Sequence, residues 1–343
     1  MSNKGLVLVT GANGYIAAKT VEAFLHAGWS VRGTVRSIKS AKGVIEALPE
    51  YADKLSFAEV PDITVPGAFD EAVKGVDAVA HLAAPVSLFF TDPEPVLKGA
   101  IHGTLRALES AHKEPSIKTF VLMSSITAIL GQKEGDYTFT EADWNTAALP
   151  LVEELGKAAP SRVIYSASKV AAEQTLWKFR DENHPTFAMT AINPVLVAGP
   201  PLVVPASQDK IGETFRLPAD VYVGKPLEEA GLPSATSAYV DVRDVARLVI
   251  FGVEHPEITN NERFIVSSAW SPAQAVADIL HKSYPERASI IKEGTPGEGY
   301  LPGYKFFPKF VVDGSKAATV TGQDYIPWEK TIIDTVEKLK PIL

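Results

Sequence analysis

The chain has 343 residues, 46% of them hydrophobic and 22% charged, which is typical of a soluble globular protein with one large or two ordinary domains. Its formal net charge is −8 and no basic stripe stands out, which argues against nucleic acid as the main partner but not against a nucleotide. The absence of cysteine excludes disulfides, thiolate nucleophiles and iron–sulfur clusters, and the seven histidines show no metal-ligand spacing.

Two apolar stretches resemble membrane or targeting segments, and neither is suited to span a bilayer. The run Leu6–Val9 is short and leads directly into a glycine-containing turn, so a buried strand is a better interpretation than a signal peptide. The stretch 78–90 is interrupted by His81, Pro85 and Ser87. We therefore expect a soluble, cytoplasmic protein. We also expect it to be a monomer or a homodimer.

The N-terminal segment predicts a β-α-β unit built around a glycine-containing turn. Residues 6–10 and 29–35 are typical of strands, and residues 15–26 are typical of a helix. The turn has the form G-x-x-G-x-x-A, in which the glycines let backbone approach a ligand and the helix start offers N–H groups to a pyrophosphate. A tight strand–helix turn without a ligand is the alternative. The expected cofactor contacts are Gly11, Asn13, Gly14, Tyr15 and Ile16.

The residues after the second expected strand indicate which nucleotide binds. NAD-binding units usually carry an acid about twenty residues past the turn, where it holds the ribose hydroxyls. Here the segment 31–39 carries no acid and ends in basic side chains. Arg36 could clamp a 2′-phosphate, with Arg32, Lys39 and Ser40 in support, so we expect NADPH in preference to NADH. A solvated basic loop is the alternative.

Strands and helices continue to alternate, which predicts an α/β fold with a doubly wound parallel sheet that helices cover on both faces. The expected elements are strands at 55–60, 76–82 and 118–124 and helices at 66–73 and 93–112. Ligands in such sheets bind beyond the carboxyl ends of the strands. Asp62 and Ile63 would then lie near an adenine, and Leu82 and Ala83 near a ribose or nicotinamide. Close packing explains the small residues at that strand end equally well.

A phenol and an ammonium four residues apart, Tyr165 and Lys169, provide the candidate chemistry. On a helix this spacing places both side chains on one face, where the lysine charge favours the tyrosinate. Ser125 follows the strand at 118–124 and could orient a carbonyl, although a serine at a strand end is usually a hydrogen-bonding terminator. The connection 128–162 between them is long, which is typical of functional inserts or lids.

The same spacing occurs a second time, at Tyr15 and Lys19. Tyr15 lies beside the expected pyrophosphate turn, where it can contact the cofactor but is badly placed for a substrate. We therefore favour Tyr165. Asp241 and Asp244 resemble a catalytic carboxylate pair, but an N-cap followed by an acid at the third helical position explains them more simply.

The C-terminal half is less regular. Residues 187–193 predict another strand, and the many prolines and glycines across 199–237 predict a smaller, irregular lobe. We assign residues 1–195 to a nucleotide-binding domain to which 238–254 return, and 196–343 mostly to a substrate-binding lobe. Further helices are expected at 242–254, 272–283 and 328–339, and a further strand at 262–267.

Four motifs occur together in this chain: Thr10-Gly-Ala-Asn-Gly-Tyr-Ile16, Ser125, Tyr165-x-x-x-Lys169 and Asn193-Pro-x-x-Val-x-Gly-Pro200. Together they resemble the extended short-chain dehydrogenase/reductase superfamily, in its branch of NADPH-dependent methylglyoxal/isovaleraldehyde and carbonyl reductases related to dihydroflavonol reductase. The resemblance implies a Rossmann-type fold and a Ser125–Tyr165–Lys169 catalytic set. Tyr165 would protonate the carbonyl oxygen, Lys169 would also bind the nicotinamide ribose, and Pro194 and Val197 would flank the nicotinamide.

The resemblance also implies a class of substrate. Its substrate-lining positions are Val86, Ile126, Leu130 and Leu196, all aliphatic, which predicts an apolar pocket for hydrophobic aldehydes and ketones; core packing is the alternative for each. Gly99 stands where epimerase-type members carry an asparagine. That difference disfavours the second function considered, a nucleotide-sugar epimerase or dehydratase. A non-catalytic NADP-binding redox sensor is the third, and it would not need the tyrosine acid.

Overall fold

Seven parallel strands form the central sheet of the computed structural model, which describes residues 4–84, 89–231, 236–304 and 310–343. Their spatial order is β10-β7-β5-β4-β1-β2-β3, so the chain starts in the middle and winds outward to both edges. The four central strands are almost entirely buried because both faces are covered. The strands are β1 Leu6–Val9, β2 Ser30–Val35, β3 Leu55–Glu59, β4 Ala78–His81, β5 Thr119–Met123, β7 Ala188–Pro194 and β10 Glu262–Val266.

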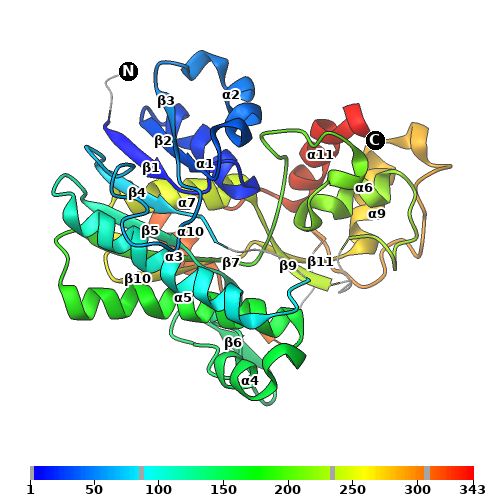
Figure 1. The fold of residues 1–343 in the computed structure, drawn as a ribbon. Coiled ribbons are helices and arrows are strands. Elements are labelled where there is room, and N and C mark those ends of the chain that lie inside the picture. The colour runs from blue at the N-terminus through cyan, green and yellow to red at the C-terminus, as the bar shows by residue number, and fades with distance from the viewer. Residues whose placement is uncertain (1–3, 85–88, 232–235, 305–309) are drawn as a thin grey trace.

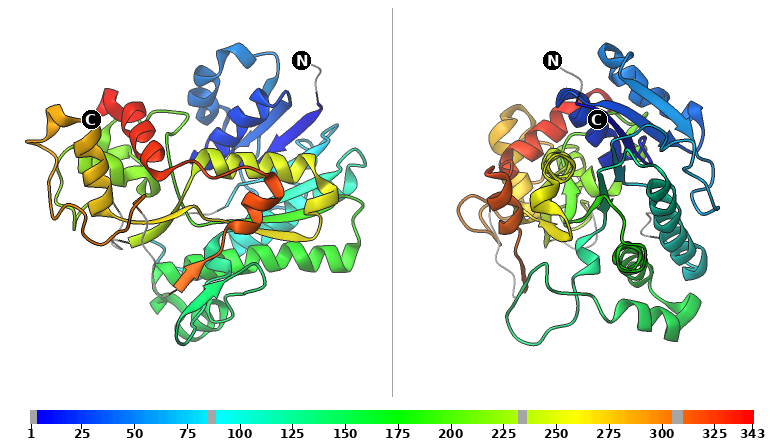
Figure 2. Two further views of the ribbon diagram at one scale, coloured as in Figure 1. Left: turned by 180° about the vertical axis from the view of Figure 1, so that it is seen from behind. Right: turned by 90° about the vertical axis from the view of Figure 1, so that its left-hand side faces the viewer.

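Two pairs of long helices cover the faces of the sheet (Figure 2). Helices α1 (Tyr15–His26) and α7 (Val242–Glu254) pack with each other and bury Phe24 and Val249 against one face. Helices α3 (Pro93–Lys113) and α5 (Ser161–Asn183) pack together on the other face. The predicted doubly wound α/β fold is confirmed. Within the described ranges, no helix is long and apolar enough to cross a membrane.

A smaller lobe with its own core is built from segments that alternate in sequence with those of the main sheet (Figure 1). Its three-stranded sheet has the order β11-β9-β8, with β9 parallel to β8 and antiparallel to β11. Its strands and helices are β8 Leu196–Ala198, β9 Thr236–Asp241, β11 Ala269–Pro272, α6 Arg216–Tyr222, α9 Ala273–Ser283 and α11 Trp328–Leu339.

The long connection after β5 forms a small subdomain beside α5 instead of an open loop. Its strand β6 (Tyr137–Phe139) pairs in parallel with β12 (Phe310–Val312), and its helix α4 (Ala148–Leu155) packs on α5. The connection is therefore attached both to α5 and to a strand from the C-terminal part of the chain.

Short elements complete the fold: α2 Lys42–Ala47, α8 Pro256–Thr259, α10 Ser315–Thr321, and 3₁₀ turns at Ile38–Ala41, Pro49–Tyr51, Ile126–Ala128, Gly156–Ala158, Gln208–Lys210, Glu213–Phe215, Pro285–Arg287 and Lys340–Ile342.

Two features differ from the sequence predictions. The helix expected at 66–73 is a series of turns, because Gly67 has φ of 75°, outside the right-handed helical region. The division of the chain also differs, because β10 is a strand of the main sheet and α10 packs on β10 and α7. Segments around 262–266 and 315–321 therefore belong with the main sheet domain.

Gly33 on β2 lies in close contact with the turn 11–14 and with β3. A Cβ atom at this position would lie 2.7 Å from the Cβ of Ala12 and 2.7 Å from the ring of Phe57. We expect Gly33→Ala to lower the free energy of unfolding by about 1–3 kcal/mol through overpacking, measured by urea unfolding. Gly131→Ala is the control, because a Cβ atom there would meet only ordinary contacts at 3.7 Å and beyond. Equal stabilities of the two variants would contradict this account.

Candidate active site

The turn 11–14 and the end of β4 are joined by one buried hydroxyl. Thr10 Oγ1 accepts hydrogen bonds from the main-chain N–H groups of Leu82, at 3.0 Å, and Ala83, at 2.9 Å. Gly11 has φ of 65°, and a Cβ atom there would lie 3.0 Å from the Cα of Ala83. Two segments that were predicted separately to contact a dinucleotide therefore lie against each other.

The start of α1 is open toward a ligand. Gly14 is the N-cap residue, no side chain caps the helix, and its first turn carries no acid. Asn13 and Gly14 are exposed, whereas Ala12 behind them is buried. The N–H groups and the positive end of the helix dipole are therefore available to an anion such as a pyrophosphate.

The segment after β2 presents basic side chains to solvent. Arg36 and Lys39 are exposed, and Arg36 has no hydrogen bond or ion pair to any part of the chain that the structure describes. Glu59 lies behind the same loop, where its carboxylate accepts the main-chain N–H of Ile38. Arg36 is thus free to reach a 2′-phosphate.

Three other predicted adenosine contacts have different surroundings. Arg32 is unsuited to the role, because its guanidinium donates to the carbonyls of Ala72 and Lys74 at 2.8 Å each and so serves as a structural tie. Asp62 accepts hydrogen bonds from the N–H and hydroxyl of Thr64, which lower the pKa of its carboxyl. Ile63 packs against Gly103 of α3, so its side chain is partly used in the core.

Helix α5 brings Tyr165 and Lys169 to the carboxyl end of β5. Lys169 is only 5% exposed, and its Nζ donates to the main-chain carbonyl of Met123, the last residue of β5, at 3.4 Å. The same Nζ lies 5.9 Å from the ring centroid of Tyr165. Tyr165 itself is half-buried, so its ring remains accessible while the lysine behind it is enclosed.

Ser125 lies two residues beyond β5 and caps the 3₁₀ turn Ile126–Ala128. Its Oγ accepts the main-chain N–H of Thr127 at 3.2 Å, so the terminator role considered for this serine is real. Because the Oγ is an acceptor in that bond, the hydroxyl proton remains available to a further acceptor, such as a carbonyl oxygen. The 3₁₀ turn packs directly against α5.

His81 at the end of β4 is a neutral neighbour of this lysine. Burial, followed by the charge of Lys169, lowers the pKa of His81 to about 3. Thr10 Oγ1 already accepts two N–H groups, so its own proton is directed to His81 Nδ1, 3.0 Å away. His81 therefore orders the turn and adds no charge to the site.

The second tyrosine–lysine pair is built differently. The hydroxyl of Tyr15 donates to the carbonyl of Gly199 at 2.8 Å, and its ring lies 4.4 Å from that of Phe215. Burial raises the pKa of Tyr15 well above its usual value, and the charge of Asp241 adds to the rise. Lys19 pairs with Glu22 instead. Tyr15 thus joins the nucleotide turn to the lobe.

The remaining predicted pocket residues are distributed over two cores. Val86 lies outside the described residues. Ile126 is buried in the main core and Leu130 packs against it, whereas Leu196 packs against the core of the lobe. Pro194 ends β7, and Val197 on β8 is buried in the main core. The rim of β7 and β8 thus connects the domain to the lobe.

A surface hollow of about 550 Å³ lies far from this constellation. It is lined by residues such as Arg180 at the end of α5, Met189 near the start of β7 and Asn261 just before β10. These positions are at the amino ends of the strands, whereas the predicted chemistry is at the carboxyl ends. The hollow is therefore separate from the candidate active site.

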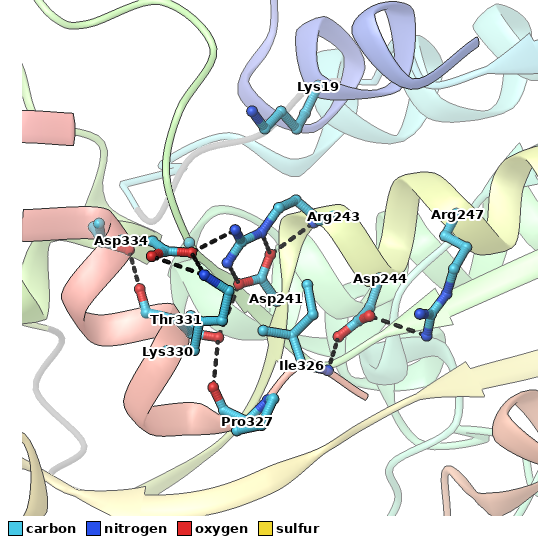
Figure 3. A network of polar contacts seen from close by, with 12 residues as sticks. Lys19, Asp241, Arg243, Asp244, Arg247, Ile326, Pro327, Lys330, Thr331 and Asp334 are labelled. Carbon is cyan, nitrogen blue, oxygen red and sulfur yellow. Dashed lines mark hydrogen bonds and ion pairs between the residues drawn. The ribbon is translucent and has the colours of Figure 1, made fainter. Parts of the chain in front are cut away.

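Figure 3 shows that Asp241 and Asp244 are bound to separate partners. Asp241 caps α7 by accepting the N–H of Arg243, and it also binds that arginine's guanidinium and the hydroxyl of Thr331 on α11. Asp244 accepts the N–H of Ile326 and pairs with an arginine one turn along α7. The capping interpretation of Asp241 is confirmed, and together the two acids attach α7 to the segment that leads into α11.

Sequence and fold both match known proteins. The sequence profile of the NAD dependent epimerase/dehydratase family matches residues 7–267. The chain belongs to this family. It is 32% identical, over 97% of both chains, to the NADPH-dependent methylglyoxal reductase Gre2 of Saccharomyces cerevisiae. It is also 32% identical to an uncharacterised oxidoreductase of Schizosaccharomyces pombe, over 99% of this chain and 98% of that one.

A solved structure extends this likeness to three dimensions. The crystal structure of yeast methylglyoxal/isovaleraldehyde reductase Gre2 with NADPH matches with a TM-score of 0.83 at 30% identity, covering 98% of each chain. The resemblance to the extended short-chain dehydrogenase/reductase superfamily is thereby confirmed.

Sequence reasoning missed several polar residues that support the site. Glu173 and Arg263 form a buried ion pair behind Lys169, and Thr10 joins the turn to β4. A usable signal existed for Glu173, which is an acid four residues after Lys169 on the same helical face. Arg263 lies 90 residues from its partner, and no local pattern indicates that pairing.

The buried carboxyl of Asp244 makes stability depend on pH. Burial raises the pKa of Asp244 to about 6. Because the folded-state value lies above the usual one, the folded protein binds this proton more tightly, and stability from Asp244 rises as pH falls through 6 toward 4. We expect the melting temperature of Asp244→Asn, relative to wild type, to be a few degrees higher at pH 7.5 than at pH 5. The same difference at both pH values would contradict the raised pKa.

Proposed function

We propose that this protein is an NADPH-dependent reductase that converts small or medium hydrophobic aldehydes and ketones to alcohols, and that runs in reverse as an alcohol dehydrogenase. The observation that carries the proposal is the enclosed Lys169, which lies beside Tyr165 and donates to the carbonyl of Met123 at the end of β5. Ser125 follows Met123 by two residues, and the turn that it caps packs on α5. Similarity to NADPH-dependent methylglyoxal reductases over nearly the whole chain supports the cofactor and the reaction class.

The residues present suit a bound dinucleotide. The turn 11–14 and the open start of α1 would hold its pyrophosphate, and Arg36 with Lys39 would hold a 2′-phosphate. Lys169 would bind the nicotinamide ribose, with Pro194 and Val197 beside the ring. When bound, NADPH supplies the hydride that the protein's own side chains cannot provide.

Tyr165 and Ser125 act on the substrate carbonyl. The Ser125 hydroxyl donates to the carbonyl oxygen and orients it, and the Tyr165 hydroxyl transfers its proton to the same oxygen as negative charge develops. The buried charge of Lys169 stabilises the tyrosinate that this transfer leaves. A substrate without a charged group fits the half-buried aliphatic residues expected near this rim, Leu130 and Leu196.

The other functions considered fit the site less well. A nucleotide-sugar epimerase needs tightly held NAD, whereas an acid that would grip ribose hydroxyls does not directly follow β2, and Gly99 replaces the asparagine of epimerase-type members. A redox sensor needs a nucleotide site but no proton donor. The arrangement of Tyr165, Lys169 and Ser125 favours turnover.

Tyr165→Phe removes the proposed acid and keeps the ring. We expect at least a 100-fold loss of kcat for reduction of a hydrophobic aldehyde, with nearly unchanged affinity for NADPH. The measurement is NADPH oxidation at 340 nm against a panel of carbonyl compounds. Tyr15→Phe is the matched control and should keep most activity, because it loses only the hydrogen bond to Gly199. Full activity of Tyr165→Phe would end the mechanistic claim.

Arg36→Ala tests the choice of cofactor. Loss of charge-assisted bonds to a 2′-phosphate should raise the KM for NADPH about 10- to 100-fold and leave the KM for NADH within about twofold. Lys178→Ala, which removes an exposed cation on α5 that pairs only loosely with Glu182 at 3.8 Å, is the control and should change neither. Wild-type turnover with NADH but not NADPH would overturn the role of Arg36.

A further inference from the structure

A third polar residue shares the helical face of Tyr165 and Lys169. Glu173 follows Lys169 by four residues and Tyr165 by eight, so the three side chains line one stripe of α5. Glu173 is completely buried, which is rare for a carboxylate unless it is paired. The catalytic scheme above does not use this residue.

The Glu173 carboxylate binds residues from β7, from β10 and from the position directly after β5. Its Oε2 accepts the hydroxyl of Ser124, at 2.5 Å, and the amide of Asn193 on β7, at 2.7 Å. Its Oε1 accepts Arg263 Nε on β10 at 2.5 Å, and a longer bond from Trp177 at 3.4 Å. Each carboxylate oxygen therefore accepts at least one hydrogen bond from the sheet side, and Oε1 accepts a further one from α5 itself.

These partners are neighbours of the candidate catalytic atoms. Ser124 lies between Met123, whose carbonyl receives Lys169, and Ser125. The amide of Asn193 donates a second hydrogen bond, to the carbonyl of Ser125, at 3.2 Å. A single carboxylate thus connects the helix that carries Tyr165 to the backbone on both sides of the serine hydroxyl.

The partner cation extends the network to the subdomain beside α5. Arg263 Nη1 donates to the carbonyls of Glu141 and Asp143, at 2.7 and 2.6 Å, and the guanidinium lies 4.0 Å from the ring centroid of Trp144. The segment 128–162 is therefore anchored to the same ion pair. Glu173 therefore connects the residues beside Ser125 with the arginine that anchors this segment.

We propose that Glu173, paired with Arg263, is a positioning residue that sets the register of α5 against the ends of β5 and β7 and so places Tyr165 and Lys169 opposite Ser125. The proposal rests on the reductase function proposed above. Glu173 touches neither substrate nor cofactor in this scheme; it acts through Ser124 and Asn193. A carboxylate is required because it accepts bonds on both oxygens, whereas a glutamine would turn a donor toward Arg263 or toward Ser124.

The first test is Glu173→Gln, assayed below its melting temperature. We expect kcat to fall at least tenfold while the dissociation constant of NADPH, measured by fluorescence, changes less than about threefold, because the turn 11–14 lies outside the network. Asp334→Asn breaks another ion pair, between Asp334 on α11 and Arg243 on α7 at 2.5 Å, and is the control for lost stability. It should lower the melting temperature and leave kcat unchanged.

A second variant separates positioning from stability. Glu173→Leu combined with Arg263→Met replaces the buried pair with apolar side chains of similar volume, a change that often restores stability. Positioning predicts that this double variant, assayed below its own melting temperature, keeps a low kcat. Wild-type kcat in the stably folded double variant would overturn the inference while leaving the reductase function intact. Absence of carbonyl reduction by the wild-type protein would instead overturn the proposed function, and this inference with it.

Discussion

Helix α5 is held against the carboxyl ends of the central strands by buried charges, and the geometry of the candidate site depends on that attachment. Lys169 and Glu173 are both buried and bind the sheet. Lys169 donates to a carbonyl at the end of β5, and Glu173 accepts hydrogen bonds from partners on β7 and β10. Enclosed ions are costly unless every bond is made. The helix therefore has one favourable register, and the tyrosine of the same stripe takes its position from it.

The nucleotide half of the site is built by close approach of backbone instead of by charge. Thr10 joins the turn after β1 to the end of β4, and Gly11 leaves space for Ala83. Tyr15 then connects that turn to Gly199 at the start of the lobe. A movement of the lobe would therefore be transmitted to the turn 11–14.

Local patterns were enough for much of the fold. Alternating apolar strands and amphipathic helices predicted the doubly wound sheet, because each period is a property of neighbouring residues. Helices 15–26, 242–254 and 328–339 begin and end where expected. The pattern failed at 66–73, where Gly67 takes a left-handed conformation, and inside 128–162, where β6 depends on a strand 173 residues away.

The sequence by itself determined the strand order of the first unit, the turn at 11–14, the missing acid after β2, and the spacing of Tyr165 and Lys169. All of these features depend on residues close together in the sequence, so local backbone geometry is enough to predict them. Tertiary structure alone decided that Arg32 is a structural tie, that Tyr15 belongs to the lobe contact, and that Glu173 meets Arg263. Those outcomes depend on which distant groups share a buried space, and the cost of an unpaired charge or donor there selects the partners.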